Sequence, residues 1–483
     1  MGPNTGRPTQ RPPSLPVIHT PLVGRRDAAR QIAQLARSGT CRLITITGPG
    51  GMGKTRLAIH LAEHLAEDFP DGVVWVPLAA VAAPELVVPT ILQNLGVHEI
   101  PGIPPLDHLL EQVQHRKLLL VLDDLEHLLA SAPDLRTIVM ASRDLVMLVT
   151  SQAPLDVGGE RVYALPPLAL PDPHASPERL LQSEAVSLFV QRARAINPYL
   201  TLTPDDADVI AAICIQLDGL PLAIELAAAR TNVLTPRALL DRLGQGLNML
   251  SSSREDLPDR LRTQRRAIAW SYGLLPEDEQ RLFRWLSVFA GGIPLAVIDA
   301  FPTAADGAFA LDLLTQLVER SLVTATLLPG EDPRYEMLEI LRAFGHEQLA
   351  LAGDEEAARA WHAAWFAACA TEAGAQVLNG GQMLAMETFG REMENIRVAL
   401  GWYLHHGSPG PALAISSASA RFWSMRGMAT EGRSWITQAL AANGDQPSSL
   451  RANAYFAAGC LAADQNDLVE ADRDFATSLA IAE

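Results

Sequence analysis

The chain has 483 residues, 48% of them hydrophobic, which is too much for one core and suits three or four domains of about 150 residues each. Its 38 basic and 55 acidic side chains give a formal net charge of −17, a balance that favours solubility and repels nucleic-acid backbones. No apolar run reaches the roughly 20 residues that a membrane-spanning helix needs. The composition therefore predicts a soluble protein and argues against an integral membrane protein.

Residues 1–20 are rich in proline and polar residues, and they contain no apolar block like that of a signal peptide. We expect a disordered leader there. The four cysteines lie far apart without a CxxC pair, which predicts buried thiols in a reducing cytoplasm and disfavours a disulfide framework or a zinc site. We therefore expect a cytoplasmic protein without a membrane partner. The cysteines are Cys41, Cys214, Cys369 and Cys460.

Residues 21–168 alternate short apolar or β-branched runs with helical stretches, the pattern of a parallel α/β sheet. Between the first two runs, Leu57, Leu61, Leu65 and Phe69 recur every four residues, which is typical of one apolar helix face packed on a sheet. We predict five strands, at residues 42–47, 73–76, 118–123, 145–150 and 161–165.

A phosphate-binding loop follows the first predicted strand. Residues 48–55 match the pattern GxxxxGK[ST] between a strand and a helix. Glycines leave backbone N–H groups free to surround phosphates, and the N-terminus of the next helix adds partial positive charge. We expect Lys54 to act on the β- and γ-phosphates and Thr55 to ligate Mg²⁺. The predicted nucleotide-binding residues of this segment are Gly48, Gly50, Gly51, Met52, Gly53, Lys54, Thr55 and Arg56.

The lysine content supports this interpretation independently. Only Lys54 and Lys117 are lysines among the 38 basic residues; the rest are arginines. Lys54 stands where a compact ammonium fits and a planar guanidinium does not.

The apolar run 118–122 ends in Asp123 and Asp124, which is the form of a Walker B strand. A buried parallel strand places a terminal carboxylate at the carboxyl edge of the sheet, beside the phosphates. We expect Asp123 to hold Mg²⁺ through water and Asp124 to position or activate the attacking water. Glu126 and His127 are interpreted as surface residues of the following helix.

The prolines between residues 166 and 177 mark a change to helices only. We place a helical domain at residues 169–255 and a winged-helix domain at residues 256–355, because three helices precede two strand-like pieces there. The expected helical domain contains helical stretches at 183–196 and 204–230. In the winged-helix domain the expected helices lie around 268–272, 279–289 and 310–320, and the strand-like pieces at 322–327 and 335–338.

Residues 356–483 are alanine-rich and helical throughout. The last 34 residues are similar to one tetratricopeptide repeat, in which Tyr455, Gly459, Ala471 and Phe475 take positions 4, 8, 20 and 24. Small residues let the paired helices approach, and Phe475 would fill the gap. We expect a protein partner or self-assembly through this repeat region.

The winged-helix domain invites a DNA-binding interpretation, which its charge disfavours. Residues 256–355 contain nine basic and sixteen acidic side chains, a net charge of −7. We therefore expect DNA contact to be unlikely within this chain and interpret the arginine cluster as an interdomain or solvated helix face. The cluster consists of Arg260, Arg262, Arg265 and Arg266.

Over residues 20–350 the chain resembles the STAND class of signal-transduction ATPases, with an NB-ARC-like order of domains and bacterial regulators as the nearest type. The resemblance rests on residues 22–26 (Leu-Val-Gly-Arg-Arg), the P-loop, the double aspartate, residues 149–151 (Val-Thr-Ser) and residues 219–222 (Gly-Leu-Pro-Leu). It implies that Val23 and Gly24 lie against adenine and that Pro221 closes over it.

Two positions depart from the pattern of that class. The arginine that often follows Thr-Ser is replaced by Gln152, and the histidine of a frequent Met-His-Asp triplet is replaced by Leu338. Sensing of the γ-phosphate and retention of ADP would then use other residues. Arg143 is one candidate for the missing arginine.

We therefore expect an α/β P-loop domain followed by a helical domain, a winged-helix domain and helical repeats. The main hypothesis is a signalling switch that binds ATP or ADP with Mg²⁺ and hydrolyses ATP slowly, using Lys54 and Asp124. A non-hydrolysing ADP-binding scaffold is the first alternative. The second is the regulatory part of a transcription factor whose DNA-binding domain lies beyond residue 483.

Overall fold

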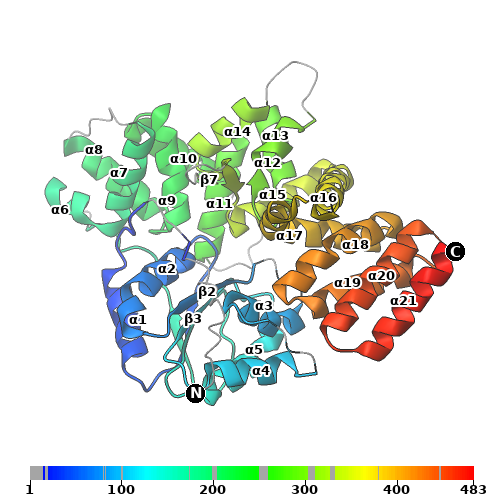
Figure 1. Cartoon of the computed structure of the whole chain (residues 1–483). Coiled ribbons are helices and arrows are strands. Elements are labelled where there is room, and N and C mark those ends of the chain that lie inside the picture. The colour runs from blue at the N-terminus through cyan, green and yellow to red at the C-terminus, as the bar shows by residue number, and fades with distance from the viewer. Residues whose placement is uncertain are drawn as a thin grey trace.

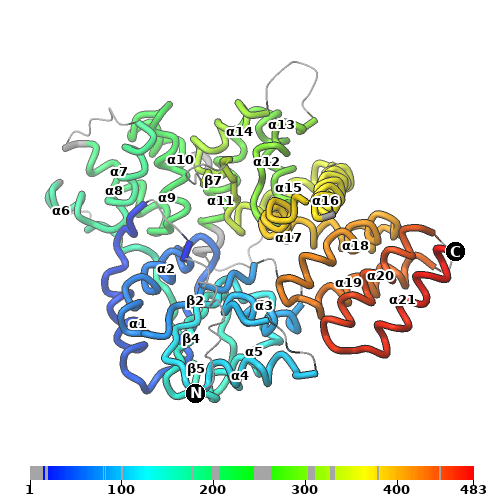
Figure 2. The backbone as a smooth tube through the Cα atoms, viewed as in Figure 1, coloured from blue at the N-terminus to red at the C-terminus, as the bar shows by residue number. Residues whose placement is uncertain are grey.

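The computed structural model describes residues 15–16, 20–79, 81, 83–98, 100, 102–172, 175–197, 204–249, 259–302, 310–326, 332–378, 380–444 and 448–483. The α/β domain, the helical domain and the winged-helix domain lie against one another, and a row of helices leads away from them to the C-terminus (Figures 1 and 2). Most of the expected leader, residues 1–14 and 17–19, lies outside the described residues.

The α/β domain is built on a sheet that has five strands in the described part of the chain, all parallel, in the order β2-β3-β4-β1-β5. The five predicted strands are confirmed to within two residues at each end. Both β1 and β3 are buried along their whole length, which explains their uninterrupted apolar sequences. The strands are β1 (Leu43–Thr47), β2 (Val73–Pro77), β3 (Leu119–Asp123), β4 (Val146–Ser151) and β5 (Glu160–Ala164).

Helices cover both faces of this sheet. Alternate strand residues point to opposite faces: Ile44 and Ile46 pack with α1 and α2, whereas Leu120 and Leu122 pack with α3, α4 and α5. The carboxyl ends of β1, β3 and β4 are thus left at one open edge, where a ligand site of a parallel sheet forms. The helices are α1 (Arg26–Arg37), α2 (Lys54–Leu65), α3 (Val87–Asn94), α4 (Pro105–Val113) and α5 (Ala132–Ala141), with short 3₁₀ turns η1 (Ala66–Asp68), η2 (Pro84–Leu86) and η3 (Leu129–Ser131).

The helical domain follows β5. Its expected stretch 204–230 is divided in two, because Asp218 and Gly219 take positive φ angles of 53° and 65°. A Cβ on Gly219 would lie 2.5 Å from the Leu168 carbonyl oxygen, so glycine lets the chain turn closely there. The helices are α6 (Pro177–Gln182), α7 (Glu184–Ile196), α8 (Pro204–Gln216), α9 (Pro221–Ala228) and α10 (Pro236–Met249), with the 3₁₀ turn η4 (Ala229–Asn232).

The next unit has the expected winged-helix order, with additions that the sequence did not predict. A two-residue strand, β6, and a short helix, α13, precede α14, and β6 joins the antiparallel sheet β6-β8-β7. Two residues are too few to give a strand pattern in a sequence. The elements are α11 (Asp259–Gly273), α12 (Glu277–Leu286), β6 (Ile293–Pro294), α13 (Leu295–Asp299), α14 (Ala310–Glu319), β7 (Thr324–Thr326), β8 (Arg334–Glu336) and α15 (Glu339–Ala352).

In the described part of residues 355–483 the regular elements are all helices, and small residues set their spacing. A Cβ on Gly459 would lie 2.7 Å from the Phe475 ring, and one on Gly432 would lie 2.7 Å from Trp423. Phe475 therefore fills the space beside Gly459, as the sequence predicted. The helices are α16 (Glu355–Leu378), α17 (Gln382–His405), α18 (Pro409–Arg426), α19 (Ala429–Ala442), α20 (Ser449–Asp464) and α21 (Leu468–Ala482).

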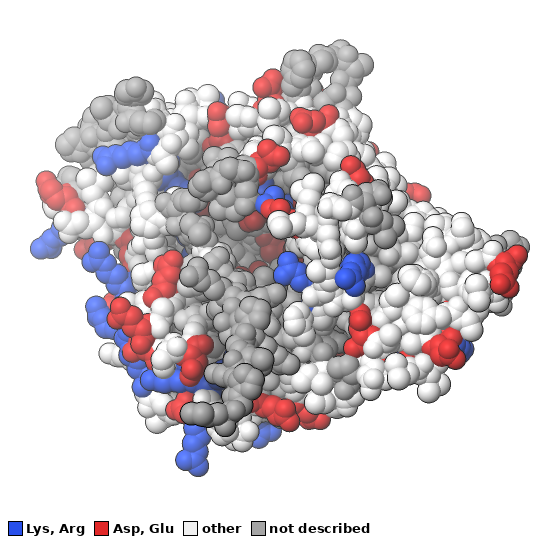
Figure 3. Space-filling view, in the orientation of Figure 1, with Lys and Arg blue, Asp and Glu red and all other residues white. Residues whose placement is uncertain are grey.

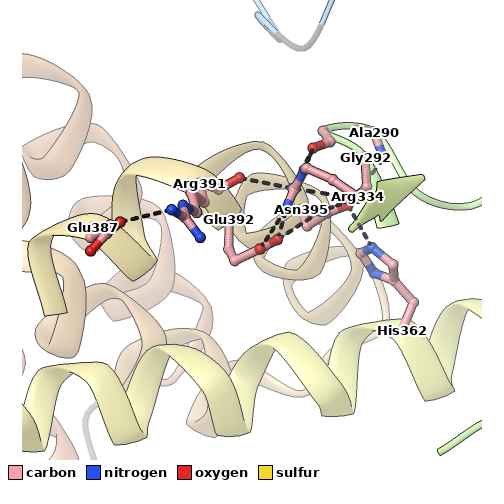
Figure 4. Close-up of polar contacts among 9 residues, drawn as sticks. Ala290, Gly292, Arg334, His362, Glu387, Arg391, Glu392 and Asn395 are labelled. Carbon is pink, nitrogen blue, oxygen red and sulfur yellow. Dashed lines mark hydrogen bonds and ion pairs between the residues drawn. The ribbon is translucent and has the colours of Figure 1, made fainter. Parts of the chain in front are cut away.

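A polar joint connects the winged-helix domain to α17 (Figure 4). The Arg334 guanidinium of β8 pairs with both carboxylate oxygens of Glu392, at 2.7 and 3.1 Å. Asn395 accepts a hydrogen bond from the Ala290 backbone N–H at 3.1 Å and donates to the Gly292 carbonyl at 2.9 Å. Such bidentate, charge-assisted contacts fix the orientation of the two elements.

The C-terminal helices also lie close to the α/β domain. A cavity of about 350 Å³ lies between them, lined on one side by Ile103 and His108 and on the other by Arg433 and Asp467. The α/β domain and the C-terminal helices therefore share the lining of one cavity.

Two further expectations concern the chain as a whole. The four cysteines are free, but only Cys214 is buried; Cys41, Cys369 and Cys460 are partly exposed, so the prediction of four buried thiols is wrong for three of them. The spacing of cysteines along a sequence does not reveal how far neighbouring side chains cover each thiol. Among the residues that the structure describes, none of the helices has both the length and the apolar content needed to span a membrane.

Candidate functional site

The P-loop connects β1 to α2 at the open edge of the sheet. Gly51 and Gly53 take φ angles of 72° and 85°, which favour glycine, and α2 begins at Lys54. The Lys54 side chain is 6% exposed, and its ammonium donates to the carbonyl oxygens of Gly48 and Pro49 at 2.8 and 3.2 Å. The ammonium is thus held inside the loop at the N-terminus of a helix.

Asp123 ends β3 beside this loop. Its Oδ1 accepts a hydrogen bond of 2.6 Å from the Thr150 hydroxyl at the end of β4. Burial, reinforced by the charge of Asp124, raises the pKa of Asp123 to about 7, against hydrogen bonds from Thr150 and Thr55. The structure therefore brings Thr55 and Asp123 together, two oxygen donors of the kind that Mg²⁺ prefers.

Asp124 lies next to this pair in an unusual backbone conformation, with φ 60°. Its N–H donates to Thr150 Oγ1 at 2.9 Å, which holds the left-handed turn in place. Burial and the neighbouring Glu126 raise the pKa of Asp124 to about 6, and the Lys54 ammonium acts in the opposite direction. A carboxyl with a raised pKa at the phosphate edge has the properties of a general base.

Glu126 and Gln152 form a pair that the sequence did not predict. Gln152 Nε2 donates to Glu126 Oε1 at 2.8 Å. Glu126 and His127 lie in the turn between β3 and η3, so the prediction that a helix carries them is wrong. The half-buried Glu126 adds a third carboxylate near Lys54. A divalent cation would offset this concentration of negative charge.

Arg143 does not replace the missing arginine. It precedes β4 (Val146–Ser151) and is exposed, whereas Thr150 and Asp123 lie at the opposite, carboxyl end of the parallel strands.

The residues assigned to adenine lie where the P-loop meets the helical domain. Gly24 has φ 66°, and a Cβ there would lie 2.5 Å from Glu184. Val23 is partly buried and packs against the hydrophobic core that the α/β and helical domains share. Pro221 begins α9, and the following Leu222 side chain packs against Gly51.

Arg25 and Arg56 link the same region. The buried Arg25 guanidinium donates to the carbonyl oxygens of Met52, at 3.0 Å, and of Pro166. Its backbone N–H donates to Glu184 Oε1 at 2.8 Å. Arg56 bonds the Thr20 carbonyl at 3.0 Å and lies 3.8 Å from Glu225 of α9. The predicted residue Arg56 thus faces the helical domain and the segment before α1, away from the loop interior.

Three contacts to the P-loop come from outside the α/β domain, and sequence reasoning missed them. Leu222 of α9 packs on Gly51, Gln264 of α11 bonds the Gly50 carbonyl, and Ile340 of α15 lies against Gly50. Gln264 and Ile340 stand in ordinary helical sequence that no motif marks, whereas Leu222 belongs to the segment 219–222, for which the sequence suggested only the adenine role of Pro221. The loop is therefore the meeting point of three domains.

The residues present fit a nucleotide with magnesium. The loop contains glycines at left-handed positions and a buried ammonium, that of Lys54, whose acceptors are the loop carbonyls. The Thr55 hydroxyl and the Asp123 carboxyl at the end of β3 lie together beside it. Polyphosphate is the anion that backbone N–H groups and a helix N-terminus recognise together.

Comparisons with known proteins agree with this architecture. Residues 36–156 match the AAA domain family, and residues 275–350 match a winged helix-turn-helix domain. The Mycobacterium tuberculosis protein Rv0890c, named as an HTH-type transcriptional regulator, is 35% identical over 402 residues, which are 83% of this chain and 44% of that protein. The chain thus spans less than half the length of this relative.

Another Mycobacterium tuberculosis protein, the uncharacterized protein Rv0894, is 32% identical over 364 residues, 73% of this chain and 89% of that protein. A solved structure, the STAND protein with a tetratricopeptide repeat sensor PH0952 from Pyrococcus horikoshii, matches with a TM-score of 0.48 and 15% identity over 97% of this chain and 65% of that one.

Fold and site together define a AAA-type P-loop protein that carries a winged-helix domain. The chain belongs to the family of Rv0894. The P-loop domain followed by a winged-helix domain, and the regulator name of Rv0890c, agree with the coarser expectation of a P-loop regulator.

The expectation about DNA is wrong. The winged helix-turn-helix match and the regulator name of Rv0890c point to DNA contact. Net charge was a poor guide because it sums over the whole domain and does not tell where on the surface the arginines and carboxylates lie. A local surface and a domain total are different quantities.

Proposed function

We propose that this protein is a nucleotide-dependent switch that binds ATP or ADP with Mg²⁺ and whose domain arrangement depends on which nucleotide is bound. The carrying observation is the contact of the helical and winged-helix domains with the P-loop through Leu222, Gln264 and Ile340. A ligand can shift a domain equilibrium only through different affinities for its states, and these contacts couple the two.

The nucleotide site follows from the roles predicted for the residues. Backbone groups of Gly48 and of residues 50–53 would surround the phosphates, Lys54 would neutralise them, and Thr55 and Asp123 would hold Mg²⁺. Bound Mg²⁺ would neutralise charge on the phosphate oxygens. Val23, Gly24 and Pro221 would border the adenine, and Arg56 would stabilise the border through Thr20 and Glu225. The division into domains at 21–168, 169–255, 256–355 and 356–483 belongs to this proposal.

Asp124 is proposed as the base for slow hydrolysis. It would accept a proton from the water that attacks the γ-phosphorus, while the bond to the β–γ bridging oxygen breaks and ADP and phosphate form. A pKa of about 6 still leaves the carboxyl ionised at neutral pH. Because this pKa is raised above the usual value, the carboxylate is a stronger base than an ordinary aspartate. The NB-ARC-like and tetratricopeptide-like assignments are kept as part of the proposal.

The arrangement seen here is proposed as the closed, ADP-bound state, and ATP would favour opening. Hydrogen exchange in the presence of ADP or a non-hydrolysable ATP analogue tests this directly. We expect faster exchange of α9 and α11 amides with the analogue, because both helices leave the P-loop on opening. Equal exchange with both nucleotides would refute the switch and leave an ADP-binding scaffold.

A second proposed function is DNA contact by the winged-helix domain, favoured by its family match and its regulator relatives. On α14, the helix before the wing, Asp312, Thr315 and Glu319 are exposed. Such side chains can bond to base edges, so phosphate contacts must come from arginines elsewhere.

Several arginines of this domain are paired with carboxylates in the closed arrangement. Arg334 pairs with Glu392 of α17, across the joint to the repeats. Opening that joint would free a cation, so we expect tighter DNA binding with the ATP analogue than with ADP. Fluorescence anisotropy with duplex DNA at several salt concentrations measures this, and affinity independent of both nucleotide and salt would contradict it.

A further inference from the structure

Gln264 stands at the point where the winged-helix domain touches the P-loop. Its side chain is fully buried, and its Nε2 donates a hydrogen bond of 2.7 Å to the Gly50 carbonyl, 214 residues away in sequence. A Cβ on Gly51 would lie only 2.5 Å from that nitrogen. The carboxamide is therefore packed directly on the backbone of Gly50 and Gly51.

Packing alone does not favour a glutamine at this position. The other end of the carboxamide, Oε1, is buried without a hydrogen-bond partner, an arrangement that costs stability. Leucine has a similar volume and would leave no buried acceptor unpaired. The hydrogen bond to the loop is thus the property that distinguishes glutamine here.

This hydrogen bond also fixes the direction of a loop N–H group. The Gly50 carbonyl belongs to the same peptide unit as the Gly51 N–H, and in a trans peptide these two groups point in opposite directions. Holding the carbonyl toward Gln264 turns the Gly51 N–H to the other side of the loop. In a P-loop, backbone N–H groups on that side surround the phosphates.

The residue before Gln264 ties the same helix to the helical domain. The Thr263 hydroxyl donates to Asp218 Oδ2 at 2.8 Å. Asp218 directly precedes the turn that leads to Leu222, and Leu222 packs on Gly51 from α9. Two adjacent residues of α11 therefore connect the winged helix to both neighbouring domains at one place.

We propose that Gln264 is a positioning residue that couples the state of the P-loop to the winged-helix domain and retains ADP in the closed arrangement. This inference rests on the proposed function, that the loop holds ADP or ATP. A bound diphosphate engages the Gly51 N–H and strengthens the bond that Gln264 makes on the other side of the peptide. By linkage, the bond in turn stabilises bound ADP.

The test compares the full chain with Gln264→Leu and with Gln280→Leu as a matched control. Gln280 lies in the same domain and bonds the Leu275 carbonyl at 2.9 Å. Dissociation of fluorescent ADP is measured by stopped flow, and affinity for a non-hydrolysable ATP analogue by equilibrium titration. Loss of one hydrogen bond should speed ADP release of Gln264→Leu roughly threefold to tenfold, with the affinity for the analogue nearly unchanged. Gln280→Leu should alter neither quantity.

The outcomes separate this inference from the proposed function. An unchanged ratio of ADP to ATP-analogue affinity in a folded Gln264→Leu protein would overturn the inference, since a purely structural residue would affect both nucleotides equally. Gln264→Glu, which keeps the shape and loses the donor when ionised, decides the matter if the leucine variant does not fold. Failure of the wild type to bind either nucleotide would instead refute the proposed function.

Discussion

The P-loop edge and the C-terminal helices differ in how far apart in sequence their contacting residues lie. At the P-loop edge, polar contacts join residues far apart in sequence: Gln264 with Gly50, 214 residues apart, and Arg25 with Glu184, 159 residues apart. In the repeats, the glycine contacts join a helix to a nearby one, as with Gly459 and Phe475. The contacts at the P-loop edge thus connect distant parts of the chain, whereas those of the C-terminal helices connect neighbouring helices.

This difference explains how each region can respond to a ligand. Where each helix packs mainly on its neighbours, a local change alters only the contacts between those neighbours. An edge that collects contacts from three domains responds as a unit, because a change in the loop alters all of them together.

On the face shown in Figure 3, basic side chains gather mostly at the left, over the α/β and helical domains, while acidic ones are also scattered over the winged helix and the C-terminal helices.

The largest effect should come from the proposed base. Asp124→Asn should lower ATP hydrolysis by at least about a hundredfold while nucleotide binding persists, because the amide cannot accept the proton. In the wild type, hydrolysis should fall as pH drops below about 6, where Asp124 becomes protonated. Phosphate release measured between pH 5 and 8 checks both points.

The exposed Asp27 serves as the control for this variant. Asp27→Asn should hydrolyse ATP at the wild-type rate with the same pH profile. Undiminished turnover in Asp124→Asn would remove Asp124 from the mechanism and assign the long-range edge a binding role alone.

Adding one methyl group at Gly459 tests how closely the C-terminal helices pack on their neighbours. Gly459→Ala should destabilise α20 and α21 by about 1–3 kcal/mol, because its Cβ would overlap the Phe475 ring. Gly401→Ala, in α17, adds the same methyl group where nothing lies within 4 Å and should be neutral or stabilising. Local hydrogen exchange of the two helices measures the difference. Equal exchange in both variants would show that the contact is not tight.

The smallest predicted effect is an increase in stability. Asp123 has a folded pKa of about 7, above its ordinary value, so ionisation opposes folding increasingly as pH rises toward 7 and fully above it. Asp123→Asn should therefore raise the thermal midpoint of the nucleotide-free protein by a few degrees, and by more at pH 8 than at pH 5. Differential scanning fluorimetry decides this, and a lower midpoint at pH 8 would contradict the pKa shift.

Sequence reasoning predicted what local pattern encodes. The five strands alternate or run apolar over five or six residues, and the P-loop and the aspartate pair lie at ends of such strands. Lys54, Asp123 and Asp124 could therefore be placed at one sheet edge from the pattern alone. The break in the stretch 204–230 and the strand β6 depend on single residues and on pairing partners, which a pattern does not contain.

The contacts of Gln264 and Ile340 with the loop, and of Glu184 with Gly24 and Arg25, could not be predicted in the same way. Each residue lies in a helix of ordinary composition and becomes part of the site only through the packing of whole domains. The DNA expectation failed for a related reason, since a summed charge over residues 256–355 carries no information on where in the domain the basic and acidic side chains lie.

The most direct test is to identify the nucleotide that co-purifies with the full chain and to titrate ADP and ATP with Mg²⁺ against wild type and Lys54→Ala. We expect bound ADP in the wild type and a loss of affinity of at least about a hundredfold in the variant, because the buried ammonium is the main counter-charge for the phosphates. Absence of bound nucleotide, together with no affinity for added ADP or ATP, would contradict the central claim.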